Sequence, residues 1–203
     1  MENTKCLDMK CVQLSKIGEI IEIICICLGV FTIPLIVPQL LSTIFGATSV
    51  IASNSQYVVG SLVNTLLILA GANTNGWKKI IGIVTLPSIS ALMGGLVLKT
   101  SSIFTLYMIP AIWVGNFAII YLYRYLFVKK NLNYIVSSII AIITKCAVIY
   151  LGFRLLVIVN IIPCASKMFT ALNVAMGINQ LITATIGATI AFGIILTMKK
   201  VNN

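Results

Sequence analysis

The hydrophobic pattern along the chain is a series of long apolar stretches separated by short polar breaks. A helix needs about 20 mainly apolar residues to cross the hydrocarbon core of a bilayer. The stretches predict an all-α integral membrane protein, a bundle of six transmembrane helices that forms one membrane domain over residues 1–203. The expected helices lie at about 17–37, 57–75, 78–98, 103–128, 134–159 and 168–198.

Composition supports a multi-pass protein of the cell membrane. Hydrophobic residues make up 60% of the chain and charged residues only 9%, whereas soluble domains carry about 25% charged residues. The first apolar stretch contains Glu19 and Glu22 and has no clear small-residue cleavage site. We therefore expect it to be retained as a helix and not removed as a signal peptide.

The positions of the cations predict the orientation of the helices. Cytoplasmic segments of membrane proteins are rich in Lys and Arg. With the N-terminus inside, only Lys99 and Lys167 fall in outer loops, and we expect both termini in the cytoplasm. The net charge of +10 thus reflects topology and predicts contact with membrane lipid, with no nucleic acid. The cytoplasmic cations are Lys5, Lys10, Lys16, Lys78, Lys79, Arg124, Lys129, Lys130, Lys199 and Lys200.

The first outer connection, residues 38–56, has no charged residue and is too apolar for an ordinary solvated loop. Irregular backbone at membrane depth is tolerated only where protein or trapped water satisfies its polar groups. We expect this loop to be partly buried, folded back into the outer leaflet or over a cavity.

Lys145 is the main candidate for chemistry. It lies about 11 residues into the helix that starts near Tyr134, which is close to the membrane midplane at 1.5 Å per residue. An ammonium there costs about 2.5–3.5 kcal/mol. It should face the bundle interior, with Glu22, a cluster of carbonyls and amides, or a bound anion as its partner. Its role is either an internal structural pair or a substrate contact.

Intramembrane amides on three helices, with aromatic residues near one of them, form a second group of candidates. Each amide alone could simply hydrogen-bond a neighbouring helix, but together they predict a polar and aromatic cavity on the outer side. In "MIPAIWVGN", Pro110 is expected to free a carbonyl and Gly115 to let Asn116 or a ligand approach the backbone. The expected substrate-binding residues are Asn64, Tyr107, Trp113, Asn116, Lys145, Asn179 and Gln180.

No enzyme constellation is present in the sequence. The chain has no histidine, and its four acidic residues all lie within the first 22 positions. The six cysteines lack the paired spacing of a zinc site and are expected to be free thiols. We therefore expect no catalytic residue, no metal and no cofactor. Without a phosphate loop, the chain is not expected to hydrolyse ATP.

Four segments carry a family resemblance: "YVVGSLVNTLLILAG", "GWKKIIGIVTLPSISALMGG", "MIPAIWVGN" and "ALNVAMGINQLITATIGATIAF", which together extend over about 57–192. They resemble the substrate-binding S components of energy-coupling-factor (ECF) transporters, in a subgroup with unassigned substrates. The resemblance implies six helices and an outer cavity, covered by the first outer loop, that binds a vitamin or similar micronutrient. It also implies docking on an ECF transmembrane coupling subunit driven by two cytosolic ATPase subunits.

The chain departs from the family on its first helix, where an Ala-xxx-Ala docking patch is common and only Cys25 and Gly29 stand here. Two other functions remain open: a self-sufficient small transporter or channel, which needs a continuous polar path, and a structural membrane protein, which needs neither Lys145 nor the amides. Lys145, Arg154 and Lys167, with no acidic residue in the outer half, favour an anionic or carbonyl-rich ligand.

Overall fold

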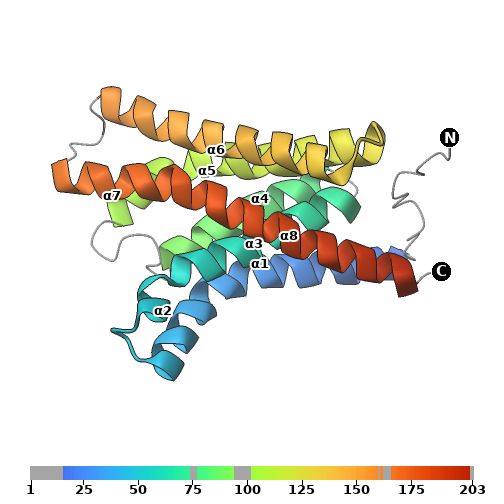
Figure 1. Cartoon of the computed structure of the whole chain (residues 1–203), viewed down its shortest axis with the longest axis horizontal. Coiled ribbons are helices and arrows are strands. Elements are labelled where there is room, and N and C mark those ends of the chain that lie inside the picture. Colours follow the sequence, from blue (N-terminus) through green and yellow to red (C-terminus); the bar gives the residue numbers. More distant parts are fainter. Residues whose placement is uncertain (1–15, 74–76, 94–101, 160, 162–165, 202–203) are drawn as a thin grey trace.

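The computed structural model describes residues 16–73, 77–93, 102–159, 161 and 166–201, and every regular element within them is a helix (Figure 1). The expected all-α architecture is confirmed for this part of the chain. In chain order the elements are α1 (Lys16–Phe45), α2 (Val50–Ser53), α3 (Ser55–Asn73), α4 (Trp77–Met93), α5 (Ser102–Tyr123), the π-helical segment η2 (Arg124–Lys129), α6 (Tyr134–Ile158), α7 (Ser166–Met176) and α8 (Ile178–Val201).

Within the described residues, five helical stretches are long and apolar enough to cross a membrane, which marks the chain as a membrane protein. They are Ile20–Phe45, Ser55–Asn73, Leu106–Lys129, Tyr134–Ile158 and Phe169–Thr197. Six were expected. The stretch expected at 78–98 corresponds to α4, whose 17 residues extend about 25 Å, less than the roughly 30 Å of a hydrocarbon core. Residues 94–98 of that prediction lie outside the described part.

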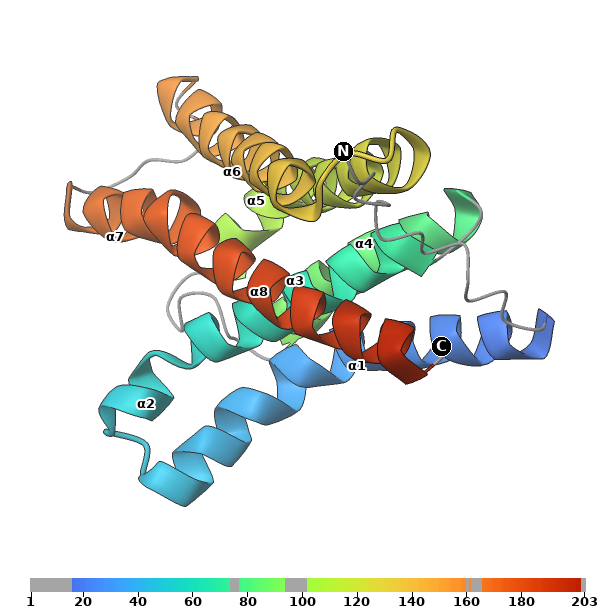
Figure 2. The same ribbon diagram turned by 45° about the vertical axis from the view of Figure 1, so that its right-hand side comes forward.

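Helix α1 is longer than the sequence pattern predicted, because it continues past Pro38 as far as Phe45. Proline lacks the N–H that bonds to the preceding turn, and it kinks a helix without always ending it. Beyond Pro34 and Pro38, the last part of α1 diverges from the bundle together with α2 (Figure 2). The prediction of a loop over 38–56 was wrong: most of the segment is a helical arm, with a turn at Gly46, where φ is 84°.

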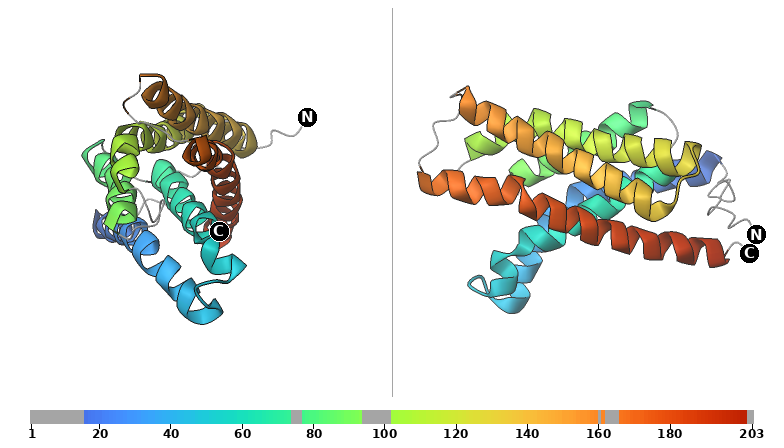
Figure 3. Two further views of the ribbon diagram at one scale, coloured as in Figure 1. Left: turned by 90° about the vertical axis from the view of Figure 1, so that its left-hand side faces the viewer. Right: turned by 45° about the horizontal axis from the view of Figure 1, so that its top comes forward.

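Helix α3 lies in the middle of the bundle and contacts α1, α4, α5 and α8 (Figure 3). Helix α6 packs on α5 and α8, and α7 contacts α6 and α8. The beginning of α1 and the end of α8 lie at one end of the bundle, which we call the terminal end. Helices α2 and α7 lie at the opposite end, which we call the α7 end.

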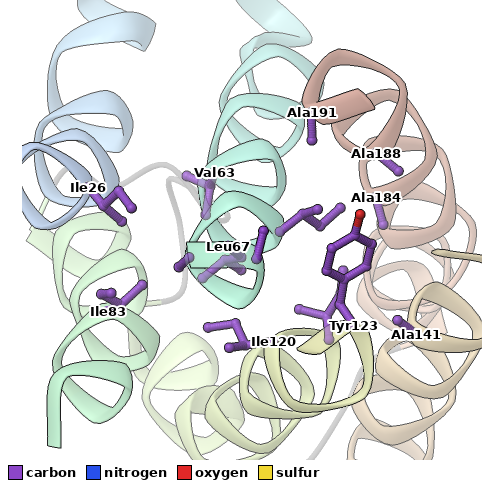
Figure 4. Close-up of a cluster of buried hydrophobic side chains, with 14 of the residues drawn as sticks. Ile26, Val63, Leu67, Ile83, Ile120, Tyr123, Ala141, Ala184, Ala188 and Ala191 are labelled. Carbon is purple, nitrogen blue, oxygen red and sulfur yellow. The ribbon is translucent and has the colours of Figure 1, made fainter. Parts of the chain in front are cut away.

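A hydrophobic core of buried side chains from α1, α3, α4, α5, α6 and α8 holds the bundle together (Figure 4). Leu67 of α3 and Ile120 of α5 are completely buried there, and the ring of Tyr123 projects from α5 toward α8. Side chains of α1 and α4, including Ile26 and Ile83, complete the core. No polar residue of the expected site belongs to this core.

Small residues on α8 allow α3 to approach closely. A Cβ atom on Gly187 would lie 2.7 Å from the carbonyl oxygen of Ser61 and 2.7 Å from Cβ of Asn64. The side-chain hydroxyl of Thr65 donates to the carbonyl oxygen of Gly187 at 3.1 Å, so a hydrogen bond also joins α3 to the backbone of α8. The small-residue pattern of α8 therefore serves packing inside the bundle.

Candidate functional site

A cavity of about 130 Å³ lies in the half of the bundle nearer the α7 end, between the first half of α3, the second half of α4 and the start of α8. Much of its wall is apolar, with Val59, Val63, Ile112 and Met176 among the lining residues. The polar lining residues are Gln56, Asn64, Ser88, Asn116, Lys145, Asn179, Gln180 and Thr183.

Lys145 borders this cavity from the middle of α6 and is only 3% exposed, as its position in the sequence predicted. Its ammonium donates a hydrogen bond to the amide oxygen Oδ1 of Asn64 on α3. Asn64 is 2% exposed, and its Nδ2 donates in turn to the hydroxyl of Thr183 on α8 at 3.4 Å. The Thr183 hydroxyl donates to the carbonyl oxygen of Gln180 at 3.2 Å. A chain of donors thus connects three helices beside the cavity.

Of the three partners expected for Lys145, the structure provides an amide. Glu22 is not its partner, because the carboxylate of Glu22 accepts a hydrogen bond from Nδ2 of Asn73 at 2.7 Å. Asn73 is the last residue of α3 and Glu22 lies near the start of α1, so this pair is toward the terminal end. Lys145 is consequently the one charged side chain among the described residues that border the cavity.

The remaining amides of the expected site are also held by neighbouring groups. The hydroxyl of Tyr57 donates to Oδ1 of Asn179 at 2.7 Å, which leaves the Asn179 NH2 group available as a donor. Nδ2 of Asn116 points to the carbonyl oxygen of Val84 at 3.5 Å. These contacts link α3 to α8 and α5 to α4 around the cavity.

The helix expected over 168–198 is interrupted at Gly177, which separates α7 from α8. The Gly177 N–H donates to the carbonyl oxygen of Asn173 at 3.1 Å at the end of α7. The Gln180 N–H donates to the carbonyl oxygen of Gly177 at 3.1 Å, where the backbone hydrogen bonds of α8 begin. The side-chain amide of Gln180 turns back to the carbonyl oxygen of Ala175 at 3.5 Å. Gln180 therefore supports the break in addition to bordering the cavity.

Two expected site residues, Tyr107 and Trp113, do not border the cavity. Tyr107 is 44% exposed, and Trp113 packs against the hydrophobic core with its indole Nε1 buried and without a hydrogen-bond partner. Gly115 does not leave room for a ligand either, because a Cβ atom there would lie 2.7 Å from the Ile149 side chain of α6. Pro110 is exposed within a continuous α5. The structure thus places these residues away from the described cavity, and their expected roles in substrate binding stay predictions.

Arg154, another cation considered as a ligand contact, does not border the cavity. The guanidinium of Arg154 lies over the ring of Phe169, 5.7 Å from its centre, and Arg154 is exposed. This agrees with the expectation that Lys145 and Arg154 do not share one pocket. The side chain of Lys167 lies outside the described part of the chain.

Two hydroxyl groups of the cavity wall were missed by the sequence analysis. Thr183 is one, and it lies one turn after Asn179 on α8. Ser88 is the other: it is 4% exposed and its Oγ has no hydrogen-bond partner among the described residues. Pro87 next to Ser88 also borders the cavity, and a proline inside an apolar helix is the signal that would have drawn attention to this part of α4.

Comparisons of this chain with protein-family models, with curated proteins and with solved structures find no match. The resemblance to S components therefore remains a prediction from the quoted sequence segments.

Proposed function

We propose that the protein is the membrane-embedded substrate-binding subunit of an ECF-type importer, and that it captures a vitamin or similar micronutrient from outside the cell. The observation that carries this proposal is the buried Lys145–Asn64 hydrogen bond beside a cavity lined from seven helices. Convergent polar groups in a mainly apolar cavity are the usual form of a small-molecule site. A purely structural bundle has no need for a buried ammonium at the middle of a helix.

The distribution of polar residues favours a binding pocket over a channel. The polar lining residues lie between the middle of the bundle, where Asn116 and Lys145 stand, and the α7 end. Toward the terminal end, Leu67, Ile68, Ile119 and Ile120 are completely buried members of the hydrophobic core and do not border the cavity. The buried hydroxyl groups of Ser137, Ser138 and Tyr123 lie toward the terminal end, but none of them borders the cavity. A channel or self-sufficient carrier would need polar groups that continue directly from the cavity.

In this proposal α4 crosses the plasma membrane together with the five longer stretches, and both ends of the chain lie in the cytoplasm. The terminal end then faces the cytoplasm, and the cavity opens toward the outside. Inward release of the solute would come from docking on an ECF transmembrane coupling subunit and two cytosolic ATPase subunits. Exposed apolar side chains on α1, such as Ile20, Ile24 and Leu28, offer a surface for lipid or for that subunit.

The proposal is tested by mass spectrometry of small molecules released from the purified protein, with Lys145→Met as the control. We expect a micronutrient-like molecule in stoichiometric amount from the wild type and its loss from the variant. A wild-type protein that releases nothing, and whose thermal stability no micronutrient raises, would contradict a solute-binding role.

A further inference from the structure

The geometry points to a small monocarboxylate as the solute, with its carboxylate on the Lys145 ammonium and its apolar part against the apolar wall. This inference rests on the proposed function, since it names the class of solute that the same cavity takes. Three features of the cavity carry it: its charge, its free hydrogen-bond donors and its size.

The charge of the cavity favours one negative charge on the solute. Lys145 is almost completely buried, its hydrogen-bond partner Asn64 is neutral, and no carboxylate pairs with it among the described residues. A buried charge without a counter-charge is strongly unfavourable. A monoanion supplies the counter-charge, whereas a dianion would bring a second, uncompensated charge and a cation would be repelled.

Hydrogen-bond donors from three helices border the cavity together with Lys145 and match a carboxylate. An ammonium has three N–H donors, of which Asn64 takes one. Within the described part of the chain the buried Ser88 hydroxyl has no hydrogen-bond partner, and Asn179 uses its oxygen to accept from Tyr57, so its NH2 group can donate to a ligand. A carboxylate accepts hydrogen bonds at both oxygens, so these groups from three helices can share one ligand group.

The size and polarity of the wall limit the rest of the solute. A volume of about 130 Å³ is below the 300–1,000 Å³ typical of sites for drug-sized ligands. Val59, Val63 and Ile112 contribute no hydrogen-bonding side chain to the wall. A short aliphatic or single-ring monocarboxylate therefore fits better than a sugar or a nucleotide.

The experiment is thermal unfolding of the full-length, detergent-solubilised protein with propionate, butyrate and benzoate. Each carboxylate is compared with its uncharged amide, and inorganic phosphate is a further probe. We expect at least one carboxylate to raise the Tm of the wild type, with no comparable shift from its amide or from phosphate. The shift should be lost in Lys145→Met, which removes the charge.

Two further variants keep the test decisive if Lys145→Met fails to fold. Ser88→Ala removes a hydroxyl that has no partner, so the ligand-free protein should unfold at the same temperature or higher. Its affinity for the carboxylate should nevertheless fall about tenfold, as expected for one hydrogen bond to a charged group. Asn64→Asp places a carboxylate beside Lys145, cancels the cavity charge and should abolish carboxylate binding while keeping the shape.

Three results would overturn the inference that the solute is a monocarboxylate. They are equal Tm shifts from a carboxylate and its amide, a Tm shift from phosphate alone, and an undiminished Tm shift in Asn64→Asp. A solute-binding role would survive these three results. If neither the carboxylates shift the Tm nor a monocarboxylate is released from the denatured wild type, the inference also fails. If the denatured protein then releases a different solute, the proposed function survives. If it releases no solute, both the proposed function and the monocarboxylate inference fail.

Discussion

The ammonium of Lys145 on α6 donates to the amide oxygen of Asn64 on α3, and both side chains are almost completely buried. The two residues are 81 positions apart in the sequence, so the hydrogen bond joins the central helix α3 to α6. A neutral amide can orient an ammonium but cannot neutralise it. The pair therefore positions a positive charge beside the cavity, which a salt bridge in the same place would not do.

Replacing Asn64 by Leu should expose how strongly Lys145 depends on it. Asn64→Leu removes the hydrogen bond to a buried charge, and we expect the free energy of unfolding to fall by about 1.5–3 kcal/mol. Adding Lys145→Met removes the charge, and buried charges are often replaced by apolar groups without loss. The double variant should therefore recover most of the loss, as measured by thermal unfolding in a double-mutant cycle. An Asn64→Leu penalty of the same size in the Lys145→Met background would show that the hydrogen bond contributes nothing.

The contact between α3 and α8 gives a second prediction with a control on the same helix. A Cβ atom on Gly187 would lie 2.7 Å from Ser61 and Asn64, so Gly187→Ala should overpack the interface and destabilise the protein by about 1–3 kcal/mol. A Cβ atom on Gly193 meets no atom within 4 Å. Gly193→Ala should be neutral or stabilise α8 by about 0.5–1 kcal/mol. Similar Tm values for the two variants would mean that α3 and α8 are not in close contact.

Much of the architecture was predictable because membrane helices follow from apolar length alone. The interior position of Lys145 was also predictable, since an ammonium at mid-membrane has no favourable place on the lipid face. The end of α1 was not, because Pro34 and Pro38 resemble a helix end in sequence but can stand inside a helix, as they do here.

The cavity wall was predicted only in part, because it depends on how each helix is rotated about its axis. Ile112 and Asn116 are four residues apart and share the face of α5 that borders the cavity. Trp113 is one residue, or about 100°, away from Ile112 and packs elsewhere. Ser88 was missed for the same reason, since one serine among many has no sequence signal for its rotation.

The position of Trp113 leads to a third prediction. Trp113 packs outside the cavity, and its indole N–H has no partner in the part of the chain that the structure describes, so Trp113→Phe should lower stability slightly by reducing its packing. The Tm shift caused by a bound solute should stay the same, in contrast to the reduced shift of Ser88→Ala. If the solute-induced Tm shift disappears in Trp113→Phe, Trp113 contacts the solute, and the solute does not bind in the cavity described above.

The six-crossing arrangement predicts a specific pattern of labelling in whole cells. Ser53 on α2 and Lys130 after η2 are both exposed, and the protein's six cysteines would first be replaced to give a cysteine-free background. A membrane-impermeant maleimide should then label Ser53→Cys in intact cells and Lys130→Cys only after permeabilisation. If α4 does not cross, α5 must start inside and end outside, and Lys130→Cys would be labelled in intact cells. That result would also place the end of α8 outside, so the same reagent distinguishes six crossings from five in one experiment.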